Sequence, residues 1–524
     1  MTPISTLAQL LSCGADDDIA IAAPTRASLT FGRLRDQVAL SLRQLRKFGI
    51  NRNDRVAIVL PNGPEIATAF LGVASGATAA PLNPGYRAEE FEFYLSDLNA
   101  RLLIVAQGSE SPAIAVAARL IIPVLRLQVD SNQPAGTFDL IADENRTGST
   151  ADGGPAQTDA PDGAQADAQA DAQADDTALV LHTSGTTSRP KIVPLSHRNI
   201  CASASNIGNT LALRAEDRGL IVMPLFHIHG LIAAVLAPLA AGGSVYCTPG
   251  FNALKFFNWM EDAKPTWYTA VPTMHQAILG RAERNREIIA AHPLRFIRSS
   301  SSSLPPQVLH ELEAVFKTRV IESYGMTEAS HQMASNLLAP GLRKPGTVGV
   351  AAGPEVAVMD ESGALLKNGA TGEIVIRGPS VTSGYENNPK ANSEAFTNGW
   401  FRTGDQGVMD TDGYLSITGR LKEIINRGGE KISPREVDDV LMDHPAVQQV
   451  VTFAMPHDKL GEDVAAAIVL REGKSATEKE VREFVSQHLA DFKVPRRILF
   501  LDEIPKGATG KLQRIGLAAK LGLG

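Results

Sequence analysis

Short apolar runs alternate with alanine-rich stretches of helical composition over residues 51–150. The runs RVAIVL and RLLIVA have the length of strands, and the stretches between them have the composition of helices. This alternation is typical of α/β layers with parallel strands. A further apolar run, ALVL at 178–181, predicts a strand that leads into the hydroxyl-rich stretch HTSGTTSRPK. The first part of the chain is therefore expected to be an α/β fold.

The pattern changes in the second half of the chain. The stretches TGEIVIRG at 371–378 and GYLSITG at 413–419 are short, alternating and bounded by glycines, which predicts an antiparallel β subdomain. From Leu421 onward, the charged helices SPREVDDVLMD and TEKEVREFVSQHLADF alternate with the apolar strands VVTFAMP and AAAIVL. A small domain of about 100 residues is expected to close the chain.

Residues 151–176 separate these patterns from the first one. The segment reads ADGGPAQTDAPDGAQADAQADAQADD and holds no aromatic or branched aliphatic side chain. Such a composition buries too little apolar surface to offset the entropy of ordering. We expect a low-complexity mobile linker or loop.

Composition narrows the class of protein. Hydrophobic residues make up 44% and charged residues 20% of the 524 residues, as in ordinary globular proteins. The net charge of -7 argues against a nucleic-acid partner, which usually requires a basic surface. The three cysteines are far apart and in no paired spacing, which suggests neither a disulfide framework nor a zinc site and favours a reducing compartment.

Targeting signals are weak or missing. The start MTPISTLAQLL lacks a basic segment leading into an apolar one, and no apolar run approaches a membrane span. The end KLGLG does not match the peroxisomal address. These observations favour a cytoplasmic enzyme, and they predict no oligomeric state.

The hydroxyl-rich stretch is the first candidate site. It fails the Walker pattern, because one glycine precedes the lysine and no Gly-Lys-Ser/Thr ending follows. Its hydroxyl, amide and lysine groups nevertheless suit phosphate oxygens, although a solvated Ser/Thr loop would have the same composition. The candidate residues are Thr183, Ser184, Gly185, Thr186, Thr187 and Lys191.

Three later segments add charged and aromatic candidates. In ESYGMTE, Glu328 suits a magnesium ion, Thr327 a phosphate and Tyr324 a purine ring, although a polar loop after a strand explains the segment equally well. Asp405 could accept both ribose hydroxyls with Arg420 nearby, but Thr-Gly-Asp is also a good turn. Lys511 ends the glycine-flanked PKGATGK, where a lysine is most often solvated.

Taken together, these segments resemble the adenylate-forming superfamily of acyl-CoA synthetases. The stretches TSGTTSRPK, YGMTE, FRTGD, GRLKEIINRGGEKISP and PKGATGK occur in the family's order, and the resemblance extends from about Leu29 to Lys511. It implies a large N-terminal adenylation domain of α/β layers with a β subdomain, residues 1–419. A hinge at 420–423 and a small mobile α+β domain at 424–524 would follow.

The resemblance also implies substrates and residue roles. ATP, magnesium and coenzyme A would be bound, and an acyl-adenylate would be formed and then passed to the thiol. Residues 183–191 would wrap the β- and γ-phosphates, and Thr327 and Glu328 would position the α-phosphate and the metal. Asp405 and Arg420 would hold the ribose. Tyr324 would hold the adenine, and its neighbours Ser323, Gly325 and Met326 would belong to the same cofactor-binding segment.

The same resemblance assigns roles near the carboxyl end. Lys511 would neutralise charge as the substrate carboxylate attacks the α-phosphorus. Lys422 would be the pivot of the small domain. Gly428 and Gly429 would approach the pantetheine arm in the second half-reaction, although a hairpin turn explains these glycines as well.

One residue departs from the family pattern. Ile192 stands where most relatives have glycine, directly after Lys191. A branched residue tolerates positive φ poorly, so the backbone there is expected to be extended or helical, with a modest effect on nucleotide affinity.

The segments expected to line the acyl site are polar. They are PLFHIHG, RSSSSSL and ASH, and a second carboxylate would need such donors to avoid being buried unpaired. This set resembles the oxalate-CoA ligase branch of the family, which implies that Ser301 and His331 contact oxalate with His229 nearby. Core hydrogen bonds are the alternative role for these side chains. The alternative functions are a CoA ligase for malonate, a medium-chain or a 4-coumarate-like acid, and a non-catalytic nucleotide-binding scaffold.

Overall fold

The computed structural model describes residues 4–142, 172–183, 190–505 and 512–523. A seven-stranded sheet occupies the first part of the chain, in the order β7-β6-β5-β3-β4-β8-β9. Its inner strands are parallel, and β7 and β9 pair antiparallel at the two edges. The expected parallel α/β layer is therefore confirmed. The strands are β3 (Arg55–Val59), β4 (Thr78–Pro81), β5 (Leu102–Ala106), β6 (Val124–Gln128), β7 (Asp139–Ala142), β8 (Thr177–Thr183) and β9 (Lys191–Ser196).

A nine-stranded sheet forms the second layer system, in the order β16-β15-β14-β13-β12-β10-β11-β1-β2. The run from β1 to β14 is parallel, whereas β15 returns antiparallel beside β14. The strands are β1 (Ile19–Ala22), β2 (Leu29–Thr30), β10 (Arg218–Ile221), β11 (Ser244–Cys247), β12 (Trp267–Ala270), β13 (Phe296–Ser299), β14 (Arg319–Met326), β15 (His331–Ser335) and β16 (Val350–Ala351).

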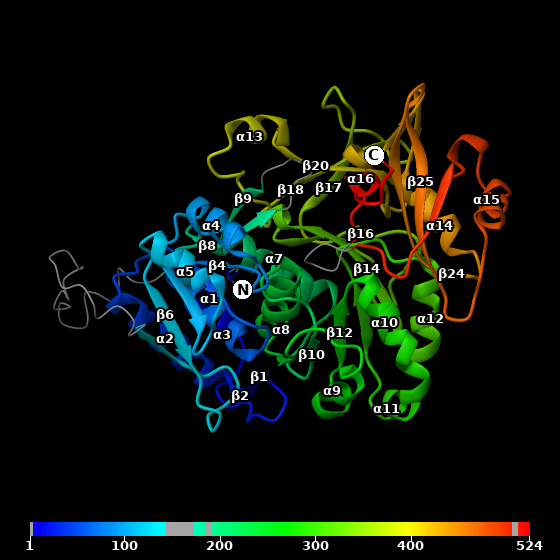
Figure 1. Ribbon diagram of the computed structural model, residues 1–524. Helices are drawn as coiled ribbons and strands as arrows, with labels where there is room; N and C mark the ends of the chain where they lie inside the picture. Colours follow the sequence, from blue (N-terminus) through cyan, green and yellow to red (C-terminus); the bar gives the residue numbers. More distant parts are fainter. Residues whose placement is uncertain (1–3, 143–171, 184–189, 506–511, 524) are drawn as a thin grey trace.

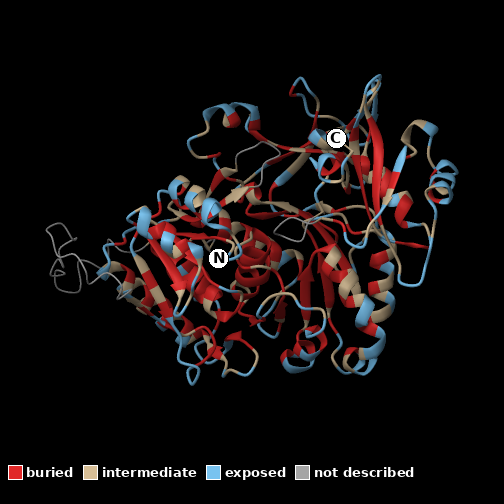
Figure 2. Cartoon of the chain, viewed as in Figure 1, coloured by how far each residue is buried: buried red, intermediate tan, exposed pale blue. Residues whose placement is uncertain are grey.

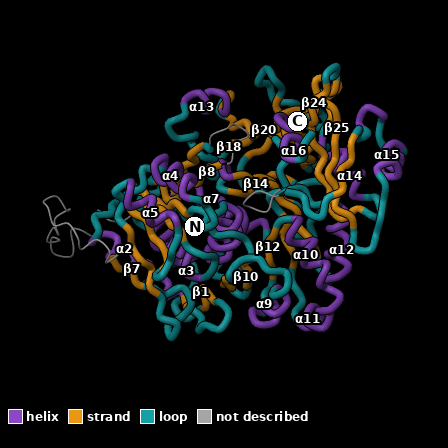
Figure 3. Tube along the Cα trace, viewed as in Figure 1, coloured by secondary structure: helices purple, strands orange, loops and turns teal. Residues whose placement is uncertain are grey.

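Helices cover the faces of both sheets, with the strands inside (Figure 3). Local signals set where they begin: Ser196 caps α7, and its side chain accepts from the N–H of Asn199. Most of the strand backbone is buried, and exposed residues lie along the outer sides of the helices (Figure 2). The helices are α1 (Leu7–Leu11), α2 (Phe31–Lys47), α3 (Pro64–Ala74), α4 (Ala88–Asp97), α5 (Pro112–Arg119), α7 (His197–Thr210), η2 (His229–Leu236), α8 (Ala237–Ala240), α9 (Phe256–Ala263), α10 (Pro272–Ala282), η3 (Glu283–Asn285), α11 (Arg286–Ala291) and α12 (Pro306–Phe316).

A smaller antiparallel sheet lies above the two layered sheets (Figure 1). It has the order β17-β18-β20-β19, with β21 paired to β20, and every pair in it is antiparallel. The predicted β subdomain is confirmed. Its elements are β17 (Glu355–Met359), β18 (Thr371–Arg377), α13 (Pro389–Ala395), β19 (Phe396–Thr397), β20 (Trp400–Met409) and β21 (Leu415–Arg420).

A separate C-terminal domain follows β21 and lies above α10 and α12 in Figure 1. It has a core of its own, which includes Val437 of α14, Val464 of β25 and Val481 of α15. Arg435 of α14 donates to the carbonyl of Ile417 at 2.7 Å, which joins this domain to β21. The elements are η5 (Leu421–Glu423), β22 (Ile425–Arg427), β23 (Glu430–Ile432), α14 (Pro434–Met442), β24 (Val447–His457), β25 (Gly461–Leu470), α15 (Glu478–Ser486), η6 (Asp491–Lys493), β26 (Arg497–Phe500) and α16 (Leu517–Lys520).

The low-complexity segment is described only at its end. Residues 151–171 lie outside the described part of the chain. Residues 172–176 form a loop, in which Asp176 forms an ion pair with Arg52 at 3.0 Å and accepts from the N–H of Gln173 at 2.7 Å. These last residues are tied down because they lead directly into β8. Among the helices of the described ranges, none is both long enough and apolar enough to cross a membrane.

Ile192 has the extended backbone that its branched side chain favours. It lies in β9 and pairs with His182 of β8. Its side chain is 5% exposed and packs in a core cluster with Val180 and Ala57. The residue is therefore part of the core beneath the strand pair.

Candidate active site

The hairpin of β14 and β15 carries predicted residues of both kinds, nucleotide-binding and acyl-binding. Tyr324 lies near the end of β14, Glu328 lies in the short helix η4 (Thr327–Ala329), and His331 begins β15. All three are buried. A single hairpin therefore positions groups that the sequence separates into two functions.

Asp405, Arg420 and Tyr324 form one cluster in the structure. Asp405 of β20 lies directly opposite Arg420 of β21 in the sheet register. The Arg420 Nε donates to Asp405 Oδ1 at 2.7 Å, and the Tyr324 hydroxyl donates to Oδ2 of the same carboxylate. Burial, and then the Asp405 charge, raise the pKa of Tyr324 well above its usual value, so the phenol stays a donor.

Glu328 lies in a second polar cluster with a partner that the sequence did not reveal. The Tyr385 hydroxyl donates to Glu328 Oε1 at 2.8 Å, and Lys191 Nζ lies 4.3 Å from the centroid of the same tyrosine ring. Burial raises the pKa of Glu328, whereas the hydrogen bond from Tyr385 and the charges of Arg420 and Lys191 lower it. The cluster brings the lysine of the hydroxyl-rich stretch to the same place as the carboxylate.

The oxygen donors around Glu328 fit magnesium. Magnesium is held in nucleotide enzymes by one or two carboxylates together with substrate phosphates. Glu328 forms no ion pair with a lysine or arginine of the described residues, and the Thr327 side chain beside it is half-buried. Within the described ranges, no group of three His, Cys, Asp or Glu side chains could hold a metal by itself. Phosphate oxygens would have to complete the coordination.

The predicted acyl residues also lie together. His229 begins η2, a π-helix, and its ring stacks on that of His331 with centroids 4.7 Å apart and an interplanar angle of 19°. The Nδ1 of His229 lies 3.0 Å from the Ser301 hydroxyl oxygen. Ser301 and His331 have φ angles of 73° and 99°, a strained region for residues other than glycine. Strain of this kind gathers at binding and catalytic sites.

Arg298 completes this group, although sequence analysis did not assign it a role. It lies in β13 and is fully buried. Its NH1 atom lies 3.3 Å from His229 Nε2 and 3.1 Å from His331 Nε2. Its NH2 atom donates to Gln332 Oε1 at 3.3 Å. An arginine inside the short buried strand FIRS, directly after two apolar residues, was the signal that could have revealed it.

Three other residues of the β14 segment have structural contacts. The Ser323 hydroxyl donates to the Ser299 carbonyl at 3.4 Å across the neighbouring strands. A Cβ atom on Gly325 would lie 2.1 Å from the carbonyl oxygen of His331, so only glycine fits between β14 and β15. Met326 pairs with His331 in the register and is half-buried.

The remaining predicted residues lie apart from these clusters or outside the described ranges. Lys422 is exposed in η5, between β21 and the C-terminal domain. Gly428 and Gly429 have φ angles of 60° and 103° and form the turn between β22 and β23. Of the other predicted residues, Thr183 ends β8 opposite Lys191. Those outside the described residues are Ser184, Gly185, Thr186, Thr187 and Lys511.

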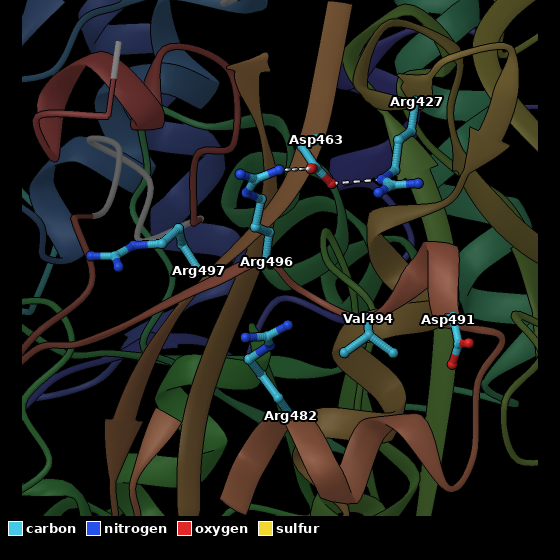
Figure 4. A pocket seen from close by; sticks show the side chains of 7 residues that line it. All are labelled: Arg427, Asp463, Arg482, Asp491, Val494, Arg496 and Arg497. Atoms are coloured by element: carbon cyan, nitrogen blue, oxygen red, sulfur yellow. Dashed lines mark hydrogen bonds and ion pairs between the residues drawn. The ribbon is translucent and has the colours of Figure 1, made fainter. Parts of the chain in front are cut away.

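An open recess of about 570 Å³ lies on the C-terminal domain and includes none of the predicted residues. Arginines dominate its lining, and Asp463 lies between Arg427 and Arg496 (Figure 4). Asp463 is paired with Arg427 at 2.7 Å and lies 3.6 Å from Arg496. The carboxylate therefore neutralises part of the positive charge there.

Known proteins resemble this chain over nearly its whole length. The family model of AMP-binding enzymes matches residues 13–386, and the model of the AMP-binding enzyme C-terminal domain matches residues 436–511. The oxalate–CoA ligase of Arabidopsis thaliana is 45% identical over 505 residues, covering 95% of this chain and 94% of the relative.

A second relative and a solved structure agree in extent. The oxalate–CoA ligase of Saccharomyces cerevisiae is 43% identical over 470 residues, covering 88% of this chain and 86% of the relative. The crystal structure of ATP-bound MatB from Rhodopseudomonas palustris superposes with a TM-score of 0.84 at 28% identity, covering 98% and 97% of the two chains. Both layered sheets, the β subdomain and the C-terminal domain fall within these likenesses.

Proposed function

Since this chain belongs to the AMP-binding enzyme family, we propose that it is an ATP-dependent acid–thiol ligase that converts oxalate and coenzyme A to oxalyl-CoA. A carboxylate oxygen of oxalate attacks the α-phosphorus of ATP, and the bond to the leaving diphosphate breaks. The thiol of coenzyme A then attacks the acyl carbon of the oxalyl-adenylate. The acyl C–O bond breaks and AMP leaves with its electron pair.

The nucleotide end of the site supports the first step. Asp405 is held by Arg420 and Tyr324, so its oxygens are fixed in place for ribose hydroxyls. Lys191 and the residues 183–187 would bind the diphosphate that leaves. Magnesium, held by Glu328 with phosphate oxygens, would supply charge neutralisation at the phosphates. Thr327 would donate to the α-phosphate.

The observation that carries the choice of oxalate is the buried cluster of His229, His331 and Ser301. A fatty or aromatic acid needs an apolar pocket, whereas a second carboxylate needs hydrogen-bond donors at the same place. The His331 imidazole and the Ser301 hydroxyl, which is hydrogen-bonded to His229, would supply such donors. Both relatives named above are oxalate–CoA ligases, which supports the same choice.

The small domain would alternate between the two steps. We place the boundaries at 1–419 and 424–524 with a hinge at 420–423, where exposed Lys422 is free of the core. Lys511 would enter the site for adenylation, and Gly428 and Gly429 would replace it for transfer to the thiol. A Lys511→Ala variant should lose pyrophosphate release but keep thioester formation from supplied oxalyl-adenylate. Equal loss in both steps would exclude this division of labour.

Carboxylate profiling tests the function. Pyrophosphate release is measured with oxalate, malonate, acetate, octanoate and 4-coumarate at equal concentration. Oxalate should give the highest kcat/KM. Best activity with octanoate or 4-coumarate would exclude oxalate and leave the adenylation chemistry in place, and no AMP formation with any acid would favour a nucleotide-binding scaffold. A cytoplasmic location is part of the proposal and is supported by the three free cysteines Cys13, Cys201 and Cys247.

A further inference from the structure

Arg298 is a buried charge, and among the described residues no opposite charge lies beside it. Its side chain is fully buried, and no carboxylate of the described residues forms an ion pair with it. Burial lowers the pKa of its guanidinium to about 9, which still leaves it charged at neutral pH. Buried arginines are normally paired, so an unpaired one requires an explanation.

The Glu322 carboxylate is only one register position away from Arg298, but it lies on the other face of the sheet. Ser299 of β13 is the register partner of Glu322 in β14, whereas Arg298 is opposite Ile321. Neighbouring residues of a strand point to opposite faces. Glu322 instead accepts from the N–H of Leu304 at 3.0 Å. The chain thus has a buried acid one position away and does not use it to neutralise Arg298.

The contacts of Arg298 determine where the two histidines carry their protons. A guanidinium group donates hydrogen bonds and cannot accept them. The Nε2 atoms of His229 and His331, both within 3.3 Å of Arg298 NH1, must therefore be acceptors. Each imidazole is then neutral with its proton on Nδ1. Thr269, opposite Arg298 in β12, agrees with this assignment, because its hydroxyl lies 2.7 Å from His229 Nε2 and can donate to it.

This proton arrangement sets the direction of the next hydrogen bond. The Nδ1–H of His229 donates to the Ser301 oxygen 3.0 Å away. The hydrogen of the Ser301 hydroxyl must then go elsewhere, and no described residue accepts it. The Nδ1 of His331 lies beside Gly325, at the mouth of the β14–β15 hairpin. Ser301 and His331 therefore act as hydrogen-bond donors, and the positive charge of Arg298 lies behind the imidazole.

We propose that Arg298 is a positioning residue that holds His229 and His331 as Nδ1–H donors and thereby makes the site select a second negative charge on the acid. This inference rests on the proposed function and deepens it. The ligand class is a short dicarboxylate, whose distal carboxylate accepts from the Ser301 hydroxyl and from His331. The negative charge of this carboxylate compensates the positive charge of Arg298, and the two imidazoles lie between the two charges. A short acid that is neutral at the distal end leaves that charge unbalanced.

Oxamate provides the matched substrate for the test. It has the size and shape of oxalate, but a neutral amide replaces one carboxylate. The kcat and KM for pyrophosphate release are measured with both acids for the wild type, Arg298→Met, Arg298→Lys and Arg295→Met. Arg295 is the control, because it lies next to β13 but is already paired with Asp217 and bonded to the carbonyl of Leu211 at 2.9 Å.

The expected result is a change in preference rather than a general loss. Arg298→Met should lower kcat/KM for oxalate by about 100-fold and for oxamate by less than about 5-fold, since one unbalanced charge in a buried site is removed. Arg298→Lys keeps the charge and should recover part of the preference. Arg295→Met should keep the wild-type ratio of the two acids. Equal losses for oxalate and oxamate in Arg298→Met, with Arg298→Lys no better, would overturn the proposal.

A second measurement needs no substrate. Protein with ¹⁵N-labelled histidine reports the proton position on each imidazole, and the signals of interest are identified by their loss in His229→Asn and His331→Asn. The wild type should show both rings protonated on Nδ1, and Arg298→Met should release at least one of them. Unchanged proton positions in Arg298→Met would overturn the role assigned to Arg298. A wild type that does not use oxalate would instead overturn the proposed function, with the imidazole result still standing.

Discussion

Asp405 and Arg298 are both buried charges in one site, but their surroundings differ in whether they include an opposite charge. Asp405 has Arg420 opposite it in the sheet and a tyrosine hydroxyl on its other oxygen. Arg298 is surrounded by imidazole, hydroxyl and amide groups, with no acid among its described partners. We therefore propose that the nucleotide end is complete before a ligand arrives, whereas the acyl end would be completed by the charge of the ligand.

The largest expected effect comes from a substitution at Asp405, in the nucleotide end of the site. Asp405→Asn leaves the shape intact but removes the charge that faces Arg420, so both ribose recognition and the fixed position of Arg420 are lost. We expect kcat/KM for ATP to fall by about 1000-fold. The measurement is pyrophosphate release at saturating oxalate. A loss of less than about 10-fold would show that Asp405 is a structural turn residue and does not bind the nucleotide.

The cost in stability should be smaller than the cost in activity. The Arg420 side chain is 42% exposed and the Asp405 side chain 8%. Because water can solvate the unpaired arginine, Asp405→Asn should lower the free energy of unfolding by about 1–2 kcal/mol, less than the loss expected for a fully buried pair. Urea unfolding of the variant and the wild type measures this difference.

The second largest effect is expected for a substitution at Gly325, which should impair the nucleotide end and the acyl end together. Gly325 lies between Tyr324 of the nucleotide cluster and the backbone of His331, where a Cβ atom would come within 2.1 Å of a carbonyl oxygen. Gly325→Ala must push β14 and β15 apart. We expect losses of about 100-fold in kcat/KM for both ATP and oxalate, because misplacement by about 1 Å has that effect. A loss confined to one substrate would show that the two ends are held independently.

The third expected effect is small in activity. Ile192 packs in the core beneath β9 and is not at a positive φ, so the family's glycine is not needed there. Ile192→Gly should change ATP turnover by less than about 5-fold and lower stability by about 2–5 kcal/mol through loss of a buried side chain. A hundredfold gain in turnover would show that the isoleucine impairs the phosphate-binding stretch. The control is Ile192→Val, which should be close to wild type in both measurements.

The smallest effect on activity is expected for a substitution at Glu322, the buried acid on the face of the sheet opposite to Arg298. Burial raises the pKa of Glu322 from 4.5 to about 7, and the charge of Arg435 in the C-terminal domain acts to lower it. At a pH between 4.5 and about 7, Glu322 has lost its proton in the unfolded chain but keeps it in the folded chain. The free energy of unfolding therefore falls as the pH rises through this range. Glu322→Gln removes this dependence.

Relative to the wild type, the Glu322→Gln variant should therefore gain stability between pH 5 and pH 8, by at most about 3 kcal/mol. Urea unfolding at the two pH values measures the gain. Its preference for oxalate over oxamate should stay at the wild-type value, because Glu322 and Arg298 lie on opposite faces. A changed preference would mean that Glu322 is the missing partner of Arg298, and the contrast between the two ends would disappear.

The sequence predicted the layers, and its motifs suggested candidate residues for a nucleotide site. Apolar runs with alternating patterns located the parallel sheet and the β subdomain, because burial on one or both faces leaves that period in the sequence. Glu328, Asp405, Arg420 and Tyr324 were found because each lies in a compact motif. The roles of the individual site residues remain predictions that the experiments above address.

The sequence could not reveal the partners that depend on strand order. Arg298 meets Thr269 because β12 and β13 are neighbours, and it meets Gln332 because β15 folds back beside β14. Tyr385 reaches Glu328 from a loop 57 residues away. A period of two identifies the face on which a side chain lies, but not the strand that lies beside it.

The unpaired charge of Arg298 also has a consequence for the life of the protein in the cell. A ligand that binds only the folded chain raises its stability, by about 2.7 kcal/mol at a concentration 100 times its dissociation constant. If the distal carboxylate of the acid balances Arg298, the acid protects the enzyme against unfolding and proteolysis. A change of this size alters protein abundance several-fold. We therefore expect the amount of enzyme to follow the supply of its own substrate, without any change in synthesis.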